Sequence, residues 1–409
     1  MHSDKRSTDA ERTHVSHGCD TCVKRNVYVV GFMDGKGKKM RLFSAPGRVE
    51  IGGNHTDHQH GRVLAAAINL EAKCSAVPNG TNAVNITNKQ YGSAIVDLTD
   101  LKVREDEKDT PAALVRGVAA WFSEHGHATG GFDGTITSNI PVGSGLSSSA
   151  AFEVLIGNVF KGLFGAELSP LDIAIAGRFA ENNYFGKPCG LMDQAASSFG
   201  GLSMIDFEDP LQTIVKPINA DLSGYSLCVV ATGGDHADLT PDYAAIPEEM
   251  KTVAKHFGKE YLREVAPEDF FAAIGKMKHL SKRALLRAVH FFDDHERVIK
   301  QADALERGDI QAFLDLVNES GRSSLAYLQN VFSSTDPHNQ ELTLALALSE
   351  KILAGKGAWR VHGGGFAGTI LAFVPDDLKE TYSTIMNEVF GENACIFLNV
   401  RKEGGMEVM

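Results

Sequence analysis

The stretch PVGSGLSSSAAFEVL, residues 141–155, restricts most strongly what this chain can fold into. It follows GFDGTITSNI, which predicts a strand, and it leads into an apolar run with helical spacing. The first turn of a helix leaves backbone N–H groups unpaired, and the helix dipole adds partial positive charge there. Because glycine and serine let a ligand approach the backbone closely, the stretch predicts a strand–turn–helix unit that binds phosphate.

The letters of this stretch do not form a Walker motif, which needs lysine and then serine or threonine after the last glycine. Leu146 and Ser147 follow Gly145 instead. A serine hydroxyl can still hold Mg²⁺ beside a phosphate. An ordinary glycine-rich turn with a serine N-cap fits the same letters, so other motifs have to decide between the two interpretations.

Composition bounds the class of protein. At about 100–200 residues per domain, 409 residues predict two or three domains, with two preferred, and 43% hydrophobic residues allow a large core. The formal charge of −12, without a long basic run, argues against nucleic acid and anionic membranes as partners. No window approaches an apolar membrane span, the first residues lack a signal-peptide core, and the six cysteines are scattered. We therefore expect a cytoplasmic protein with reduced thiols.

Hydrophobic periodicity predicts strands followed by helices, twice over, which is typical of two α+β domains. We expect a flexible polar leader at 1–26, an N-terminal domain at 27–205 and a C-terminal domain at 206–409. The expected strands are 27–32, 40–44, 68–80, 83–89, 131–140, 224–232, 369–374 and 394–400. The expected helices are 111–125, the run after residue 147, 171–183, 246–257, 267–274, 282–308, 310–320 and 342–353.

The leader holds one cysteine and histidine cluster, formed by His14, His17, Cys19 and Cys22. Cys-x2-Cys can be half of a zinc site, but no second such pair completes a structural site elsewhere in the sequence. Two interpretations stay open, a flexible polar leader and an adventitious metal-binding tail.

A second polar motif is APGRVEIGGNHTDHQHG, residues 45–61. Asn54, His55 and Asp57 lie beside a Gly-Gly turn, and Arg48 comes shortly before them. A sugar hydroxyl is both donor and acceptor, so this density of polar groups suits a polyol. A solvated polar loop is the alternative.

Two further segments complete the pattern. GGGFAGT, residues 363–369, allows close backbone contact and would alone be a plain turn; KPCGLMDQAASSFG spans 187–200. In this order and spacing the four motifs resemble the galactokinase family of the GHMP small-molecule kinases, as a divergent branch, from about Leu42 onward. The resemblance implies an α+β, two-domain GHMP kinase fold. Its N-terminal domain has a mixed sheet, its C-terminal domain is ferredoxin-like and helical, and the active site lies in the cleft between them.

The resemblance implies ATP-dependent phosphorylation of a sugar at its anomeric hydroxyl. Asp193 falls on the catalytic aspartate, which accepts the proton of the sugar O1. Arg48 falls on the arginine that stabilises the transferring phosphoryl group and keeps Asp193 ionised. Ser149 and Glu181 fall on the Mg²⁺ ligands. The implied ATP-binding residues are Pro141, Gly143, Ser144, Gly145, Leu146, Ser147, Ser148 and Ser149.

The resemblance also implies the sugar contacts. Asp57 would take a pair of ring hydroxyls, which distinguishes an axial C4 hydroxyl, and His55 is a second ligand. Gly190 would offer backbone, and Tyr243 would face the sugar. Asn54 belongs to the same set. The expected partners are a small-molecule sugar and ATP, with no nucleic acid or membrane, for a monomer or weak homo-oligomer.

Several positions depart from the family pattern, and four of them bear on the ligands. Asn54 replaces a glutamate that normally faces the C6 hydroxyl, and Glu50 replaces an asparagine, so the first change favours a C6 carboxylate and the second disfavours it. Pro111 and Leu114 replace a tryptophan and a tyrosine, which predicts an aliphatic wall for the adenine and leaves the nucleotide preference open.

Three functions remain in order of preference. The first is a galactokinase making galactose 1-phosphate. The second is a kinase for galacturonate or another galacto-configured sugar. The letters DHQ at residues 57–59 also resemble the plant galacturonate kinases of the same superfamily. The third is a non-catalytic sugar and ATP sensor, which the intact Ser-Ser-Ala-Ala at 148–151 disfavours.

Overall fold

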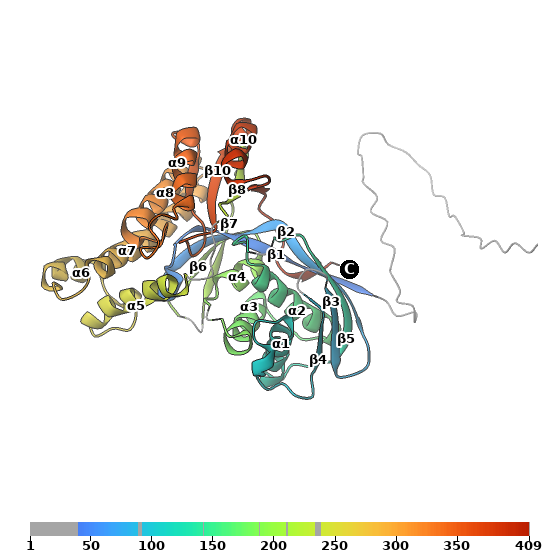
Figure 1. Cartoon of the computed structure of the whole chain (residues 1–409). Helices are drawn as coiled ribbons and strands as arrows, with labels where there is room; N and C mark the ends of the chain where they lie inside the picture. The colour runs from blue at the N-terminus through green and yellow to red at the C-terminus, as the bar shows by residue number, and fades with distance from the viewer. Residues whose placement is uncertain are drawn as a thin grey trace, which may run out of the picture. The chain divides into compact units, whose positions relative to one another are not determined.

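The structure is a computed structural model that describes residues 40–408, apart from 89–91, 142, 188, 210–211 and 234–238 (Figure 1). The described residues belong to one compact unit, Met40–Met409. The expected leader, the cysteine and histidine cluster and the strand at 27–32 lie outside the described residues. The division near residue 205 stays a prediction.

The expected strands and helices follow one another along the described chain in the predicted order, with further short strands and two helices, Met192–Phe199 and Lys379–Phe390, that were not expected. The strands are β1 (Arg41–Gly52), β2 (Arg62–Pro78), β3 (Ala83–Asn88), β4 (Ala94–Asp97), β5 (Phe132–Ser138), β6 (Leu202–Asp206), β7 (Ile214–Ile218), β8 (Tyr225–Ala231), β9 (Ala358–Val361), β10 (Thr369–Pro375), β11 (Cys395–Leu398) and β12 (Met406–Glu407). The helices are α1 (Pro111–Glu124), α2 (Ser148–Phe164), α3 (Pro170–Ala180), α4 (Met192–Phe199), α5 (Thr240–His256), α6 (Pro267–Ala273), α7 (Lys282–Glu306), α8 (Ile310–Ser323), α9 (Glu341–Leu353) and α10 (Lys379–Phe390).

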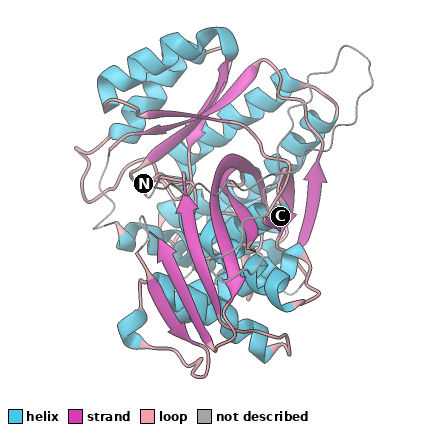
Figure 2. Ribbon diagram, turned by 90° about the vertical axis from the view of Figure 1, so that its right-hand side faces the viewer, coloured by secondary structure: helices cyan, strands magenta, loops and turns pink. Residues whose placement is uncertain are grey.

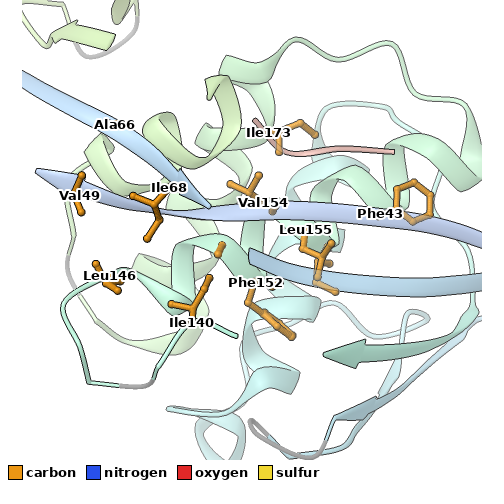
Figure 3. Packing of buried hydrophobic residues seen from close by; sticks show 14 of the residues in the cluster. Phe43, Val49, Ala66, Ile68, Ile140, Leu146, Phe152, Val154, Leu155 and Ile173 are labelled. Carbon is orange, nitrogen blue, oxygen red and sulfur yellow. The ribbon is translucent and has the colours of Figure 1, made fainter. Parts of the chain in front are cut away.

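The larger sheet is mixed, as the resemblance implied for the N-terminal domain. Its order is β12-β1-β2-β5-β3-β4, and β6 pairs with both β2 and β7. β3 and β5 run parallel, whereas the other pairs are antiparallel. β2 has 17 residues, so one half of it pairs with β5 and the other half with β6. Helix α2 packs its apolar side on β1 and β2, and Val154, Leu155 and Ile68 belong to the same buried core (Figure 3).

The smaller sheet is antiparallel in the order β11-β8-β10-β9 (Figure 2). Both of its faces carry buried side chains. Successive side chains of a strand point to opposite faces. Cys228 and Val230 of β8 accordingly join a hydrophobic cluster with α9 and α10, while Leu227 and Val229 join the main core. The strand expected at 224–232 is therefore buried on both faces, except at its two end residues.

Local signals explain where the helices that carry the site begin and end. α3 begins at Pro170 behind a capping box formed by Ser169 and Asp172. Both α3 and α8 continue into a π-helical turn, at Glu181–Phe185 and Ser324–Leu328. Such turns are frequent at functional sites because the extra residue changes the direction of the side chains. Among the helices that the structure describes, none has the length and apolarity to cross a bilayer.

Candidate active site

The glycine–serine stretch forms the predicted strand–turn–helix unit. Gly143 and Gly145 have φ of 75° and 70°, and Ser147, at φ 56°, is the N-cap of α2. A Cβ on Gly145 would lie 2.9 Å from the Thr369 hydroxyl, so the turn requires a glycine there. The serines at 147–149 are partly exposed, whereas Leu146 is buried.

Arg48 lies on strand β1 and reaches the turn from there. This part of the polar motif at 45–61 is therefore a strand and not the solvated loop of the alternative interpretation. The register of β1 and β2 shifts between Pro46 and Arg48, and such bulges redirect side chains beside active sites. Arg48 donates from its backbone N to the Leu146 carbonyl (3.2 Å) and from Nη1 to the Gly145 carbonyl (2.6 Å). The strand and the turn are therefore locked to one another at Arg48.

Asp193 meets Arg48 at the start of α2, although 145 residues separate them. The pair is bidentate, with Nε–Oδ1 and Nη2–Oδ2 distances of 2.7 Å, and the Ser147 hydroxyl also donates to Oδ2. Burial raises the pKa of Asp193, but the charge and hydrogen bonds of Arg48 and the Ser147 hydrogen bond outweigh it. The pKa therefore lies below the usual range of a carboxyl group, and Asp193 is ionised at neutral pH.

Two hard oxygen donors lie beside the same helix start. The Ser149 hydroxyl donates to Glu181 Oε1 at 3.2 Å, and Gln194 Nε2 contacts both Glu181 Oε2 (2.7 Å) and Glu153 Oε2 (2.9 Å). The described residues contain no group of three or more acidic, histidine or cysteine side chains that holds a metal alone. Because Mg²⁺ is often bound by one or two carboxylates together with substrate phosphates, Ser149 and Glu181 fit such a site.

Asp57 and Gly190, both expected at the sugar, are in contact. A Cβ on residue 190 would lie 2.4 Å from Asp57 Oδ2, so a glycine is needed for the approach. His55 has the left-handed φ of 57° and shares a hydrogen bond of 2.9 Å between Nε2 and the Gly364 carbonyl. Burial lowers the pKa of His55 to about 3, so the ring is neutral. Because the Gly364 carbonyl only accepts, the ring carries its proton on Nε2. Its Nδ1 is buried without a hydrogen-bond partner among the described residues, and is left as an acceptor.

The glycine triplet at 363–365 gathers the other sugar-side residues. Its three carbonyl oxygens accept, in order, from Asn54 Nδ2 (2.7 Å), His55 Nε2 (2.9 Å) and the Tyr243 hydroxyl (2.8 Å). A Cβ on Gly364 would lie 2.3 Å from the Tyr243 ring. The triplet therefore serves close packing of the backbone against these side chains, and it is more than a plain turn.

The two departures at positions 50 and 54 form one hydrogen-bonded pair. Asn54 is fully buried, and its Nδ2 also donates to Glu50 Oε1 at 2.9 Å. Asn54 Oδ1 accepts from Ser324 Oγ (3.2 Å) and Asn330 Nδ2 (2.8 Å). Glu50 is buried too, and its Oε1 accepts from Arg360 Nη2 at 2.8 Å. Protein groups thus occupy the whole Asn54 amide, and its expected contact with a sugar stays a prediction.

Sequence reasoning missed two residues of this network. Gln194 follows Asp193 directly and lies between two carboxyl groups, and His362 precedes the glycine triplet and accepts from the Glu50 N–H at 3.2 Å. Their adjacency to motif residues is the only sequence signal. A separate cavity of about 1080 Å³ is lined by parts of β6, β7 and β8, and the predicted site residues do not line it.

Comparison with known proteins agrees with this arrangement. The family model "GHMP kinases N terminal domain" matches residues 113–201, and "Galactokinase galactose-binding signature" matches residues 32–76. The fold is similar to that of a Lactococcus lactis galactokinase complexed with galactose (TM-score 0.79, 24% identity, 91% of this chain and 96% of the other). It is also similar to a Methanococcus jannaschii mevalonate kinase (TM-score 0.65, 14% identity, 88% of this chain and 98% of the other).

The matched segments contain Arg48, the glycine–serine turn, Glu181 and Asp193, which are the residues that the structure brings together. The chain therefore contains a GHMP kinase N-terminal domain at 113–201 and the galactose-binding signature of the galactokinases at 32–76, on a fold similar to that of these kinases.

Proposed function

We propose that this kinase transfers the γ-phosphoryl group of ATP to the anomeric hydroxyl of galactose and so makes galactose 1-phosphate. The observation that carries the proposal is the bidentate pair of Arg48 and Asp193 at the first residues of α2. It sets an ionised carboxylate and a guanidinium directly beside a helix start that suits phosphate.

In this mechanism Asp193 accepts the proton of O1 as that oxygen attacks the γ-phosphorus. The O1–P bond forms, the bond to the β–γ bridging oxygen breaks, and ADP leaves. Arg48 stabilises the negative charge on the transferring group, and the backbone N–H groups at the start of α2 bind phosphate oxygens. Phosphoryl transfer depends mainly on positioning and charge stabilisation, so these groups suffice for it.

We assign Mg²⁺ binding to the Ser149 hydroxyl and the Glu181 carboxylate, together with phosphate oxygens. Bound Mg²⁺ would neutralise charge on the phosphates. Gln194 holds the second Glu181 oxygen at 2.7 Å, which orients the carboxylate toward Ser149.

For the sugar, Asp57 is proposed to accept from two ring hydroxyls, with the backbone of Gly190 beside it. His55 is proposed to accept from a further hydroxyl through Nδ1, since its Nε2 proton is bonded to the Gly364 carbonyl. Tyr243 would present its ring, because its hydroxyl is bonded to the Gly365 carbonyl. The galactose bound to the Lactococcus lactis relative supports this choice of sugar.

The pair of Glu50 and Asn54 favours galactose over galacturonate. The carboxylate missing at position 54 is present on Glu50, 2.9 Å from the Asn54 amide. A C6 carboxylate near this pair would lie beside a second buried carboxylate, and Arg360 is already bonded to that one, so the approach is unfavourable. The sensor alternative is disfavoured because the Arg48, Asp193 and Ser147 contacts are complete.

The test is a panel of sugars with Mg-ATP, read by ATP consumption. We expect turnover with galactose; turnover with galacturonate alone would reverse the order, and sugar binding by calorimetry without turnover would support the sensor. Asp193→Asn should lower kcat at least about 100-fold while leaving sugar binding intact. Asp315→Asn, the same change at an exposed residue of α8, is the control. Normal turnover of Asp193→Asn would remove the proposed base.

A further inference from the structure

Two side chains of α7 hold the backbone of the segment 53–60, which we call the sugar loop. Asp294 Oδ2 accepts from the Asn54 N–H at 2.9 Å, and His290 Nε2 lies 2.9 Å from the Asn54 carbonyl. Because that carbonyl only accepts, His290 donates from Nε2, and its Nδ1 accepts from Ser323 Oγ at 2.8 Å. One helical turn of α7 thus binds both backbone polar groups of Asn54.

These two side chains, which we call the clamp, are themselves fixed by buried contacts. His290 and Asp294 are both fully buried, and neither has a part in the proposed phosphoryl transfer. Asp294 also accepts from Arg297 Nη1 (2.5 Å) and from Ser320 Oγ (3.2 Å). The ion pair and the serine hydroxyls of α8 therefore leave the clamp residues little freedom to reorient.

The clamp acts on a strained point of the chain. The Asn54 carbonyl belongs to the peptide group that precedes His55, and this group sets the φ of 57° at His55. A residue other than glycine persists in this left-handed region only when its surroundings over-determine it. Gly53, at φ 83°, gives the other half of the turn. Fixing the Asn54 peptide groups therefore fixes the direction of the His55 ring.

We propose that His290 and Asp294 are positioning residues of the sugar site, which act through Asn54 to hold His55 for a sugar hydroxyl. The proposal rests on the proposed sugar kinase activity, but not on the identity of the sugar. Since the clamp bonds end at the sugar loop and at α8, losing them should weaken sugar binding and leave ATP binding unchanged.

The test compares disruptive and conservative variants by the KM for sugar, the KM for ATP, kcat and the thermal midpoint. The sugar used is the one that wild type phosphorylates fastest, so a wrong choice of galactose does not affect this test. His290→Leu and Asp294→Ala should raise the sugar KM about tenfold or more, with the ATP KM within about twofold. His290→Gln keeps a donor of similar reach, and Asp294→Asn keeps an acceptor. Both conservative variants should therefore have a sugar KM within about threefold of wild type.

Tyr382→Phe is the matched control, because it removes a fully buried hydrogen bond of 2.8 Å to Ser349, in the cluster behind the smaller sheet. It should lower stability without changing either KM. The proposal is overturned if the disruptive variants keep the wild-type sugar KM, or if Tyr382→Phe raises it equally. Should both disruptive variants fail to fold, Ser323→Ala, which frees the His290 ring, gives the decision in the same assay.

Discussion

Gly190→Ala isolates the position of the Asp57 carboxylate. The φ of Gly190 is open to any residue, so alanine meets no backbone strain, but its Cβ would lie 2.4 Å from Asp57 Oδ2. Ordinary contact begins at 3.4 Å, so the carboxylate has to move by about 1 Å. A misplacement of that size in a positioning group costs about 100-fold in rate, or about 2.7 kcal/mol of transition-state stabilisation.

The assay is ATP consumption with galactose varied at saturating Mg-ATP, and then with ATP varied. We expect kcat/KM for galactose to fall about 100-fold, the KM for ATP to stay unchanged and the thermal midpoint to stay near wild type. Gly275→Ala is the control, because a Cβ there meets nothing within 4 Å. If Gly190→Ala stays within about threefold of Gly275→Ala in kcat/KM for galactose, Asp57 does not position the sugar.

Two predictions concern stability. Arg360→Met leaves the Glu50 carboxylate buried without its 2.8 Å partner, so the free energy of unfolding in urea should fall by about 3–5 kcal/mol. Adding Glu50→Gln to this variant should recover part of the loss. No recovery would refute the coupling of the two residues. Burial raises the pKa of Asp294, but His290, Arg297, Arg360 and the hydrogen bond from Ser320 together hold it below the usual range. Because the folded pKa is the lower one, this stabilisation is present above the ordinary carboxyl pKa and is lost as pH falls through the folded value. The urea stability of wild type relative to Asp294→Asn should therefore shrink below about pH 4, and a constant difference down to pH 3 would contradict the shift.

The strand–turn–helix unit at 141–155 was predictable because neighbouring residues determine it. The contact of Arg48 with Asp193 was expected only through resemblance, since no local pattern links residues so far apart. Helix α4, which begins one residue before Asp193, was missed because eight residues with few large apolar side chains give little periodicity. The short strands β6, β7, β9 and β12 exist because distant strands pair with them, which propensity does not register.

The pair of Glu50 and Asn54 shows a second limit of sequence reasoning. Taken one at a time, the two substitutions pointed to opposite sugars, and only their hydrogen bond shows that they act together. The clamp on α7 gave no signal either, because polar residues four apart on a long helix are usually solvated. Tertiary burial turns His290 and Asp294 into partners of the sugar loop.

The edge strand β12 has a consequence for biosynthesis. Met406 and Glu407 pair with β1, which carries Arg48, and Gly405 donates its N–H to the Ser197 carbonyl of α4, which carries Asp193. A ribosome makes Arg48 and Asp193 long before these bracing residues. The nascent polypeptide therefore holds β1 and α4 without these last contacts, and the proposed phosphotransfer centre is complete only when residue 407 has left the exit tunnel.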